Sequence, residues 1–122
     1  MNHLFFNAGK ASAQVVPEKY IILTKGYALI LTCKVNEETT TITWKKDGNS
    51  ITERAVIDTR LYEKTSKLTL TEVVEEDSGE YSCEASNKLR NVARSVVTVD
   101  VKGKLFKGLH IISVINYVRS SL

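Results

Sequence analysis

The chain has 122 residues, which is close to the commonest size of a single domain. Its hydrophobic fraction of 43% and charged fraction of 25% are those of an ordinary soluble globular protein. The net charge of +3 is too small to indicate a nucleic-acid partner or an anionic membrane surface, and no apolar run approaches the roughly 20 residues of a membrane-spanning helix.

Short strands separated by turn signals are predicted from Val15 onward, and no helical period of useful length is present. The first strand includes Val15 and Val16, and Pro17 ends its sheet pairing because proline lacks a backbone N–H. Residues 20–23 are predicted to form the second strand. The clearest alternation follows Gly26 and predicts a third strand, with a core face made of Tyr27, Leu29, Leu31, Cys33 and Val35.

Five further strands follow. Ile42 and Trp44 are predicted to point inward from the next one, and residues 47–49 then turn the chain. A strand is predicted at residues 54–60, and another carries Leu68 and Leu70 on its core face. In the last two strands, five side chains are predicted to face the core: Tyr81, Cys83, Ala85, Val97 and Val99.

Two neighbouring segments form the most specific motif in the sequence. Residues 67–73 read Lys-Leu-Thr-Leu-Thr-Glu-Val, and residues 76–87 read Glu-Asp-Ser-Gly-Glu-Tyr-Ser-Cys-Glu-Ala-Ser-Asn. With Cys33 and Trp44 upstream, this run resembles the I-set of the immunoglobulin superfamily over residues 15–102. The resemblance implies an all-β fold, a two-sheet antiparallel immunoglobulin-like sandwich with Greek-key connections. The modest distance from Trp44 to Leu68 leaves little room for the additional strands of a variable-type domain.

The resemblance also implies roles for individual residues. Cys33 and Cys83 are expected to form a disulfide on which Trp44 packs, with Leu68 and Leu70 in the core. The Tyr81 hydroxyl is expected to bond to the backbone just upstream. The remaining implied roles lie at one corner, where Asp77 pairs with Arg54 and Gly79 permits the tight turn.

The sequence departs from the family pattern in a loop. Residues 87–91 form the turn between the last two strands and lack the usual glycine, so Asn87 or Asn91 is expected to supply any left-handed conformation.

Catalytic and metal-binding chemistry have no support in the sequence. The two histidines, His3 and His110, lie in the terminal segments, and both cysteines are assigned to the core. We expect no enzyme activity, no cofactor and no metal. The remaining function is surface recognition of another protein. The candidate contact residues on the outward face of one sheet are Thr43, Lys45, Ser82, Glu84 and Arg94. Those in the adjacent loops are Glu37, Glu38, Lys88, Leu89 and Arg90.

Two functions stay open from the sequence. The first is an extracellular or cell-surface recognition module of a larger adhesion or receptor protein, whose partner is a protein (homophilic, heterophilic or a neighbouring domain). The alternative is a structural, mechanical spacer of an intracellular titin-like sarcomeric or cytoskeletal protein. In that case residues 20–23, paired in parallel with residues 97–101, would bear force. The first predicts an oxidised cysteine pair and the second a reduced pair.

The two ends do not continue the strand pattern. We expect residues 1–12 to be an extension that is not native or not ordered, residues 13–102 to be the domain, and residues 103–122 to lie outside it. One hypothesis is translated intron sequence, because Gly103-Lys104 can be encoded by a splice-donor consensus and residues 4–9 by a splice acceptor. The alternative is that residues 105–118, rich in β-branched side chains, dock on the domain or on a neighbour.

Overall fold

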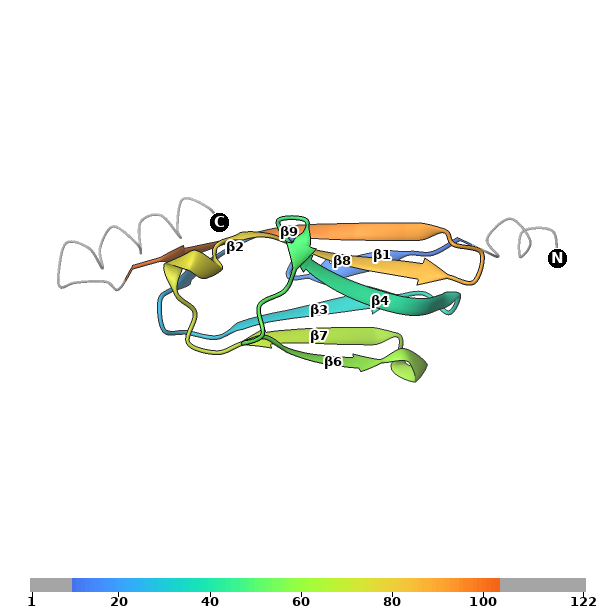
Figure 1. Ribbon diagram of the computed structural model, residues 1–122, viewed down its shortest axis with the longest axis horizontal. Coiled ribbons are helices and arrows are strands. Elements are labelled where there is room, and N and C mark those ends of the chain that lie inside the picture. The colour runs from blue at the N-terminus through green and yellow to red at the C-terminus, as the bar shows by residue number, and fades with distance from the viewer. Residues whose placement is uncertain (1–9, 104–122) are drawn as a thin grey trace.

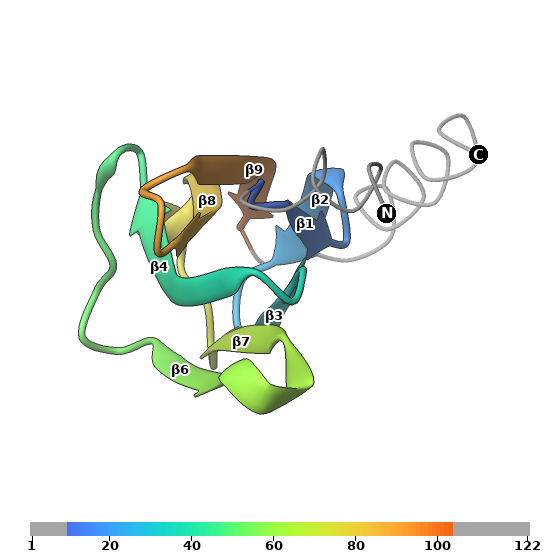
Figure 2. The same ribbon diagram turned by 90° about the vertical axis from the view of Figure 1, so that its right-hand side faces the viewer.

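Two β-sheets pack face to face in the computed structural model, which describes residues 10–103 (Figures 1 and 2). One sheet has four strands in the order β1 (Ala13–Val16), β3 (Leu29–Val35), β7 (Thr65–Leu70), β6 (Val56–Arg60). The other has five, in the order β2 (Lys19–Thr24), β9 (Val92–Lys102), β8 (Gly79–Asn87), β4 (Thr39–Lys46), β5 (Asn49–Ser50). Two single-turn 3₁₀ helices, η1 (Leu61–Glu63) and η2 (Glu75–Asp77), complete the described elements. The predicted fold class, an immunoglobulin-like sandwich, is confirmed.

The chain changes sheet at Pro17. Strand β1 pairs antiparallel with β3, whereas β2 pairs in parallel with β9, from Lys19 opposite Val97 to Thr24 opposite Lys102. Proline cannot donate a ladder hydrogen bond, so the edge pairing of β1 ends there and the next strand is free to join the other sheet. The predicted parallel pairing of these two segments is therefore present, while the other strand pairs are antiparallel.

The core lies between the two sheets and is supplied by alternate residues of each strand. Cys33, Trp44, Tyr81 and Cys83 occupy its centre. The aliphatic side chains that surround them are almost fully buried: Val15, Leu29, Leu31, Leu68, Leu70, Val73, Val97, Val99 and Val101. Alternation with period two therefore predicted most of the interior, since strands that bury one face need only that pattern.

The prediction for strand β3 is wrong at its N-terminal end. Tyr27 was predicted to lie on the core face, but its side chain is 65% exposed and β3 begins only at Leu29. Gly26 adopts a φ of 98°, and the Tyr27 N–H donates to the Thr24 carbonyl, so Tyr27 belongs to a turn. The predicted strand at residues 54–60 is likewise shorter, because Arg54 lies in the turn that precedes β6.

Candidate functional site

The disulfide between Cys33 and Cys83 joins the two sheets across the core. It links β3 to β8 with a Cα–Cα distance of 6.3 Å, and both cysteines are fully buried. Trp44 lies opposite Cys83 in the β4–β8 ladder and is 5% exposed. The indole Nε1 donates to the Ser66 hydroxyl at 2.9 Å, and Ser66 in turn shares a hydrogen bond with Thr59. The structure therefore places these three predicted residues together and adds Ser66 and Thr59, which sequence reasoning missed.

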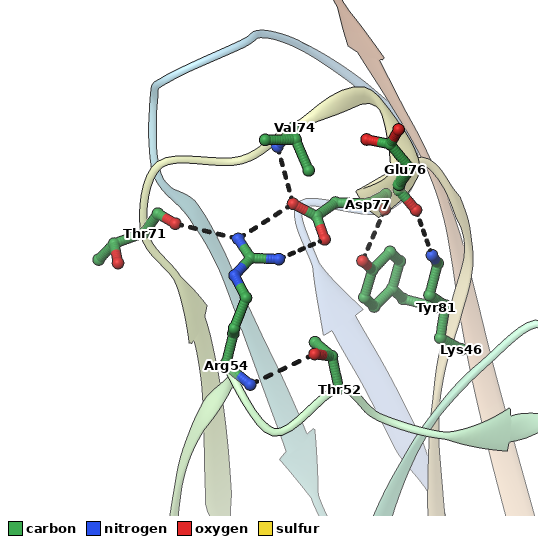
Figure 3. Close-up of polar contacts among 8 residues, drawn as sticks. All are labelled: Lys46, Thr52, Arg54, Thr71, Val74, Glu76, Asp77 and Tyr81. Atoms are coloured by element: carbon green, nitrogen blue, oxygen red, sulfur yellow. Dashed lines mark hydrogen bonds and ion pairs between the residues drawn. The ribbon is translucent and has the colours of Figure 1, made fainter.

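A polar corner closes the end of the sandwich at which β9 leaves (Figure 3). Arg54 donates twice to the Asp77 carboxylate, at 2.8 and 3.2 Å, and once to the Thr71 carbonyl. The Val74 N–H also donates to Asp77, and the Tyr81 hydroxyl donates to the Asp77 carbonyl at 2.6 Å. The pair expected from the family resemblance is thus in contact, and it ties the start of the β6 segment to the β7–β8 connection.

The ionisation of this corner follows from burial and its hydrogen bonds. Burial would raise the pKa of Asp77, but the hydrogen bonds from Arg54 and from the Val74 N–H hold that pKa below its ordinary value. Burial, reinforced by the Asp77 charge, raises the pKa of Tyr81 to about 12. The corner is therefore a charged carboxylate beside a neutral phenol at physiological pH, and both groups are held by hydrogen bonds within the domain.

Gly79 is required by a close approach as well as by its backbone. It has a φ of 155°, and a Cβ at this position would lie 2.7 Å from Asp47 Oδ2. The Asp47 carboxylate is held there because Asp47 Oδ1 accepts the Glu80 N–H at 2.8 Å. The glycine therefore permits the turn between β4 and β5 to pack on the start of β8.

The outer face of the five-stranded sheet carries charges that neutralise one another. Glu84 lies 3.5 Å from Lys45 and 3.7 Å from Arg94, and Arg94 also approaches Glu80 at 4.0 Å. These residues come from β4, β8 and β9, so the ion pairs cross the strands. Such half-exposed pairs contribute little stability, and a partner that used them would first have to break them.

Ser82 was predicted to be exposed on this face, but it is buried. Although its side chain alternates outward, it is 1% exposed. The residue sits in the central strand β8, opposite Lys45 on one side and Val96 on the other. Longer neighbouring side chains cover a serine in that position, which the alternation of one strand cannot reveal.

The β8–β9 loop (residues 88–91) is held by one side chain. Asn87 is 7% exposed, and its Oδ1 accepts the N–H groups of Leu89 and Asn91, each at 3.0 Å. The Arg90 N–H donates to the Asn87 carbonyl, and Arg90 itself adopts the left-handed conformation with a φ of 66°. The expectation that Asn87 or Asn91 would adopt it is wrong, because Asn87 continues the strand and acts through its side chain instead. An asparagine at a strand end is the signal that could have identified this role.

This loop projects three candidate contact residues into solvent. Leu89 is 70% exposed, and Lys88 and Arg90 flank it. Within residues 10–103 neither cation makes an ion pair, in contrast to the charges of the sheet face. Glu37 and Glu38 lie at the same end, since Thr39 pairs with Asn87. The structure therefore separates the predicted binding residues into a self-neutralised face and an open loop.

The described residues hold no group of three His, Cys, Asp or Glu side chains placed to bind a metal ion. His3, His110 and residues 105–118 lie outside the described residues. Of the two proposed splice junctions, residues 4–9 and Lys104 also lie outside them, and only Gly103 is described. Among residues 10–103, no helix has the length and apolar character needed to cross a membrane.

Similarity to known proteins agrees with this architecture. A family model described as "Immunoglobulin domain" matches residues 12–87. The chain is 37% identical over 87 residues to human Brother of CDO, covering 67% of this chain and 7% of that protein. It is 34% identical over 93 residues to the neural cell adhesion molecule L1.1 of Danio rerio, covering 72% of this chain and 8% of that protein. The chain thus spans less than a tenth of either relative.

Solved structures show the same fold at lower identity. A chimeric titin Z1Z2 structure superposes with a TM-score of 0.67 at 20% identity, covering 80% of this chain and 99% of that one. The titin M10–obscurin-like 1 complex superposes with a TM-score of 0.63 at 22% identity, covering 77% and 97%. The family match, the disulfide-linked sandwich and the corner around Asp77 lead to one conclusion: this chain belongs to the immunoglobulin domain family.

Proposed function

We propose that this chain is a non-enzymatic protein-recognition domain of a larger cell-surface adhesion or receptor protein, acting outside the cell. Two curated relatives support this function, one of them a neural cell adhesion molecule, and each is far longer than this chain. The buried Cys33–Cys83 bond is also in keeping with an oxidising compartment, where such bonds persist. Residues 13–102, from the start of β1 to the end of β9, are the segment that we assign to the domain.

The β8–β9 loop is the observation that carries the proposal. Asn87 fixes the loop through two hydrogen bonds to its backbone, so a partner need not order it and the entropic cost of binding is reduced. Leu89 at the tip is the apolar anchor, and Lys88 and Arg90 beside it are free of ion pairs within residues 10–103. The complementary surface is an apolar pocket with an acidic rim on another protein.

A panel of cell-surface ectodomains displayed on cells tests this function, with the full chain presented as a multimer. We expect capture by at least one ectodomain, and loss of that capture with Leu89→Asp. Val56→Asp is the matched control, because Val56 is similarly exposed, at 65%, but lies on the other sheet. The proposal would be refuted if no ectodomain captured the chain specifically, or if the Leu89→Asp variant were captured as well as the parent chain.

A mechanical role in a titin-like intracellular chain is the second candidate. The six-residue parallel pairing of β2 with β9 supports it, because strands that run in parallel near the two chain ends are loaded in shear when the ends are pulled. The two functions differ in the state of Cys33 and Cys83 in the native source. Thiol labelling followed by mass spectrometry should find an unlabelled, oxidised pair for the cell-surface function and two labelled thiols for the intracellular one.

A further inference from the structure

The two ends of the sandwich carry different charges. In Figure 1 the turns around η1 and the β8–β9 loop lie at the end opposite to η2 and the end of β9. We call residues 36–38, 61–64 and 88–91, with Lys10 beside them, the basic pole. We call residues 25–28, 51–55 and 71–78, with Gly103, the acidic pole. The antiparallel ladders place successive turns at alternate ends, which is why each pole draws on segments far apart in the sequence.

Cations exceed acids among the described residues of the basic pole. Lys88, Arg90, Lys64 and Lys10 lie there, and the Asn36 side chain donates to the Lys10 carbonyl at 2.6 Å. The opposing acids are Glu37, Glu38 and Glu63, of which Glu63 is 3.7 Å from Arg60. Two apolar side chains project from the same pole, Leu89 at 70% exposure and Tyr62 at 82%.

Acids exceed cations among the described residues of the other pole. Glu53, Glu72, Glu75 and Glu76 are exposed, and none of them makes an ion pair within residues 10–103. Arg54 is already occupied by Asp77, and the Lys46 ammonium donates to the Glu76 carbonyl, which leaves Lys25 as the exposed cation among them. Tyr27, at 65% exposure, supplies an apolar side chain to this pole.

We propose that the acidic pole of a second copy of this chain is a partner of the basic pole, in a head-to-tail contact. This inference rests on the proposed function and names the partner of the same loop. Opposite charges attract across this contact, whereas basic-to-basic or acidic-to-acidic contacts bring like charges together. Leu89 and Tyr62 on one copy meet the surface around Tyr27 on the next.

The position of the chain exit fits this arrangement. Glu75 Oε2 lies 3.5 Å from the point where a Cβ on Gly103 would sit, so a carboxylate of the acidic pole lies beside the place where the chain leaves β9. A module of the same kind placed after Gly103 would present its basic pole to these carboxylates. The contact is heterologous, and each bound pair therefore keeps one free basic and one free acidic pole, which allows further copies to add in a line.

Sedimentation velocity of the full chain tests the contact. We expect concentration-dependent association at low salt that is weakened at 1 M salt, where the Debye length falls to about 3 Å. Lys88→Glu with Arg90→Glu should weaken association by more than about tenfold, as should Glu72→Lys with Glu75→Lys and Glu76→Lys. Lys34→Glu with Lys67→Glu is the control, because it reverses two exposed cations on the outer face of the other sheet.

Mixing the two pole variants gives the sharpest result. The unchanged acidic pole of the first variant still matches the unchanged basic pole of the second, and the two reversed poles match each other. We therefore expect the mixture to associate in equal proportions, although each variant alone associates only weakly. A monomeric parent chain, or association that survives both sets of reversals, overturns the head-to-tail contact. The variant reversed at the acidic pole keeps residues 88–91, so its capture by an ectodomain beside a monomeric parent chain would overturn this inference and leave the proposed function standing.

Discussion

At the scale of single residues, the polar atoms of the two large aromatic side chains in the core, Trp44 and Tyr81, each have a hydrogen-bond partner. The Trp44 indole reaches Ser66, and the Tyr81 hydroxyl reaches the Asp77 carbonyl. Burying a polar group without a partner costs stability, so each of these large aromatic side chains can fill the core only because its polar atom is paired. Asp77 serves Tyr81 with its backbone and Arg54 with its side chain, which makes it the central residue of the corner.

Tyr81 gives a prediction about alkaline stability. Its pKa is raised from 10.0 to about 12 in the folded chain, so the fold favours the neutral phenol. That contribution is complete below pH 10 and is lost as the pH rises through about 12, because the unfolded state releases the proton first. Denaturant unfolding at stepped pH should therefore show the parent chain losing stability across this range.

The Tyr81→Phe variant isolates the group. It should lose about 1–2 kcal/mol at neutral pH, since the hydrogen bond to Asp77 is gone. It should also lose less stability than the parent between pH 10 and 12, because it has no phenol to ionise at this position. An identical alkaline slope in the two proteins would contradict the role assigned to the buried hydroxyl.

At the scale of elements, strands are fixed by alternation, and loops are fixed by individual side chains. The β8–β9 loop has no glycine, yet Arg90 adopts the left-handed conformation, which is uncommon for a residue with a Cβ. The two bonds to Asn87 Oδ1 and the bond from the Arg90 N–H to the Asn87 carbonyl offset that strain. The exposed position of Leu89 is thus a property of Asn87 as much as of the loop itself.

Asn87→Ala should release this loop while leaving the sandwich folded. We expect the amides of Leu89 and Asn91 to exchange their hydrogens faster, and any binding through Leu89 to weaken, because the loop must then be ordered at the moment of binding. Hydrogen-exchange NMR measures the first effect directly. Unchanged protection of both amides, with the β8 and β9 ladder intact as the internal reference, would show that Asn87 does not hold the loop.

At the scale of the whole molecule, the disulfide and the sheet crossing define the sandwich. Cys33 and Cys83 are 50 positions apart, and their bond ties β3 of one sheet to β8 of the other at the middle of the core. The crossing of the chain at Pro17 places β1 and β2 on different sheets, so both sheets gain an edge strand from the first described segment of the chain. The domain is held together across its layers as well as within them.

Removing the disulfide should lower the free energy of unfolding by about 4 kcal/mol, the value that the chain-entropy description gives for a loop of this length. The Cys33→Ala and Cys83→Ala double variant leaves no unpaired thiol, and guanidinium unfolding of oxidised parent and variant measures the difference. The reduced parent chain is the matched control, because it keeps both sulfur atoms in the core. A variant as stable as the oxidised parent would show that packing around Trp44 alone holds the two sheets together.

The sequence by itself determined the fold class, most of the strands and most of the core. These depend on period-two alternation and on a family signature, both of which are local in the chain. The corner residues Arg54, Asp77 and Tyr81 were also identified from the family resemblance, and the structure places Asp77 in contact with the other two.

Only the tertiary structure decided which surface side chains are available. Lys45, Glu84 and Arg94 come from three strands and neutralise one another, while Ser82 is covered by its neighbours in adjacent strands. The approach of Asp47 to Gly79 and the gathering of charges at two poles likewise join segments that are distant along the chain. A pattern read along one strand carries no information about the side chains opposite it, and burial, ion pairing and the shape of a binding surface all depend on those neighbours.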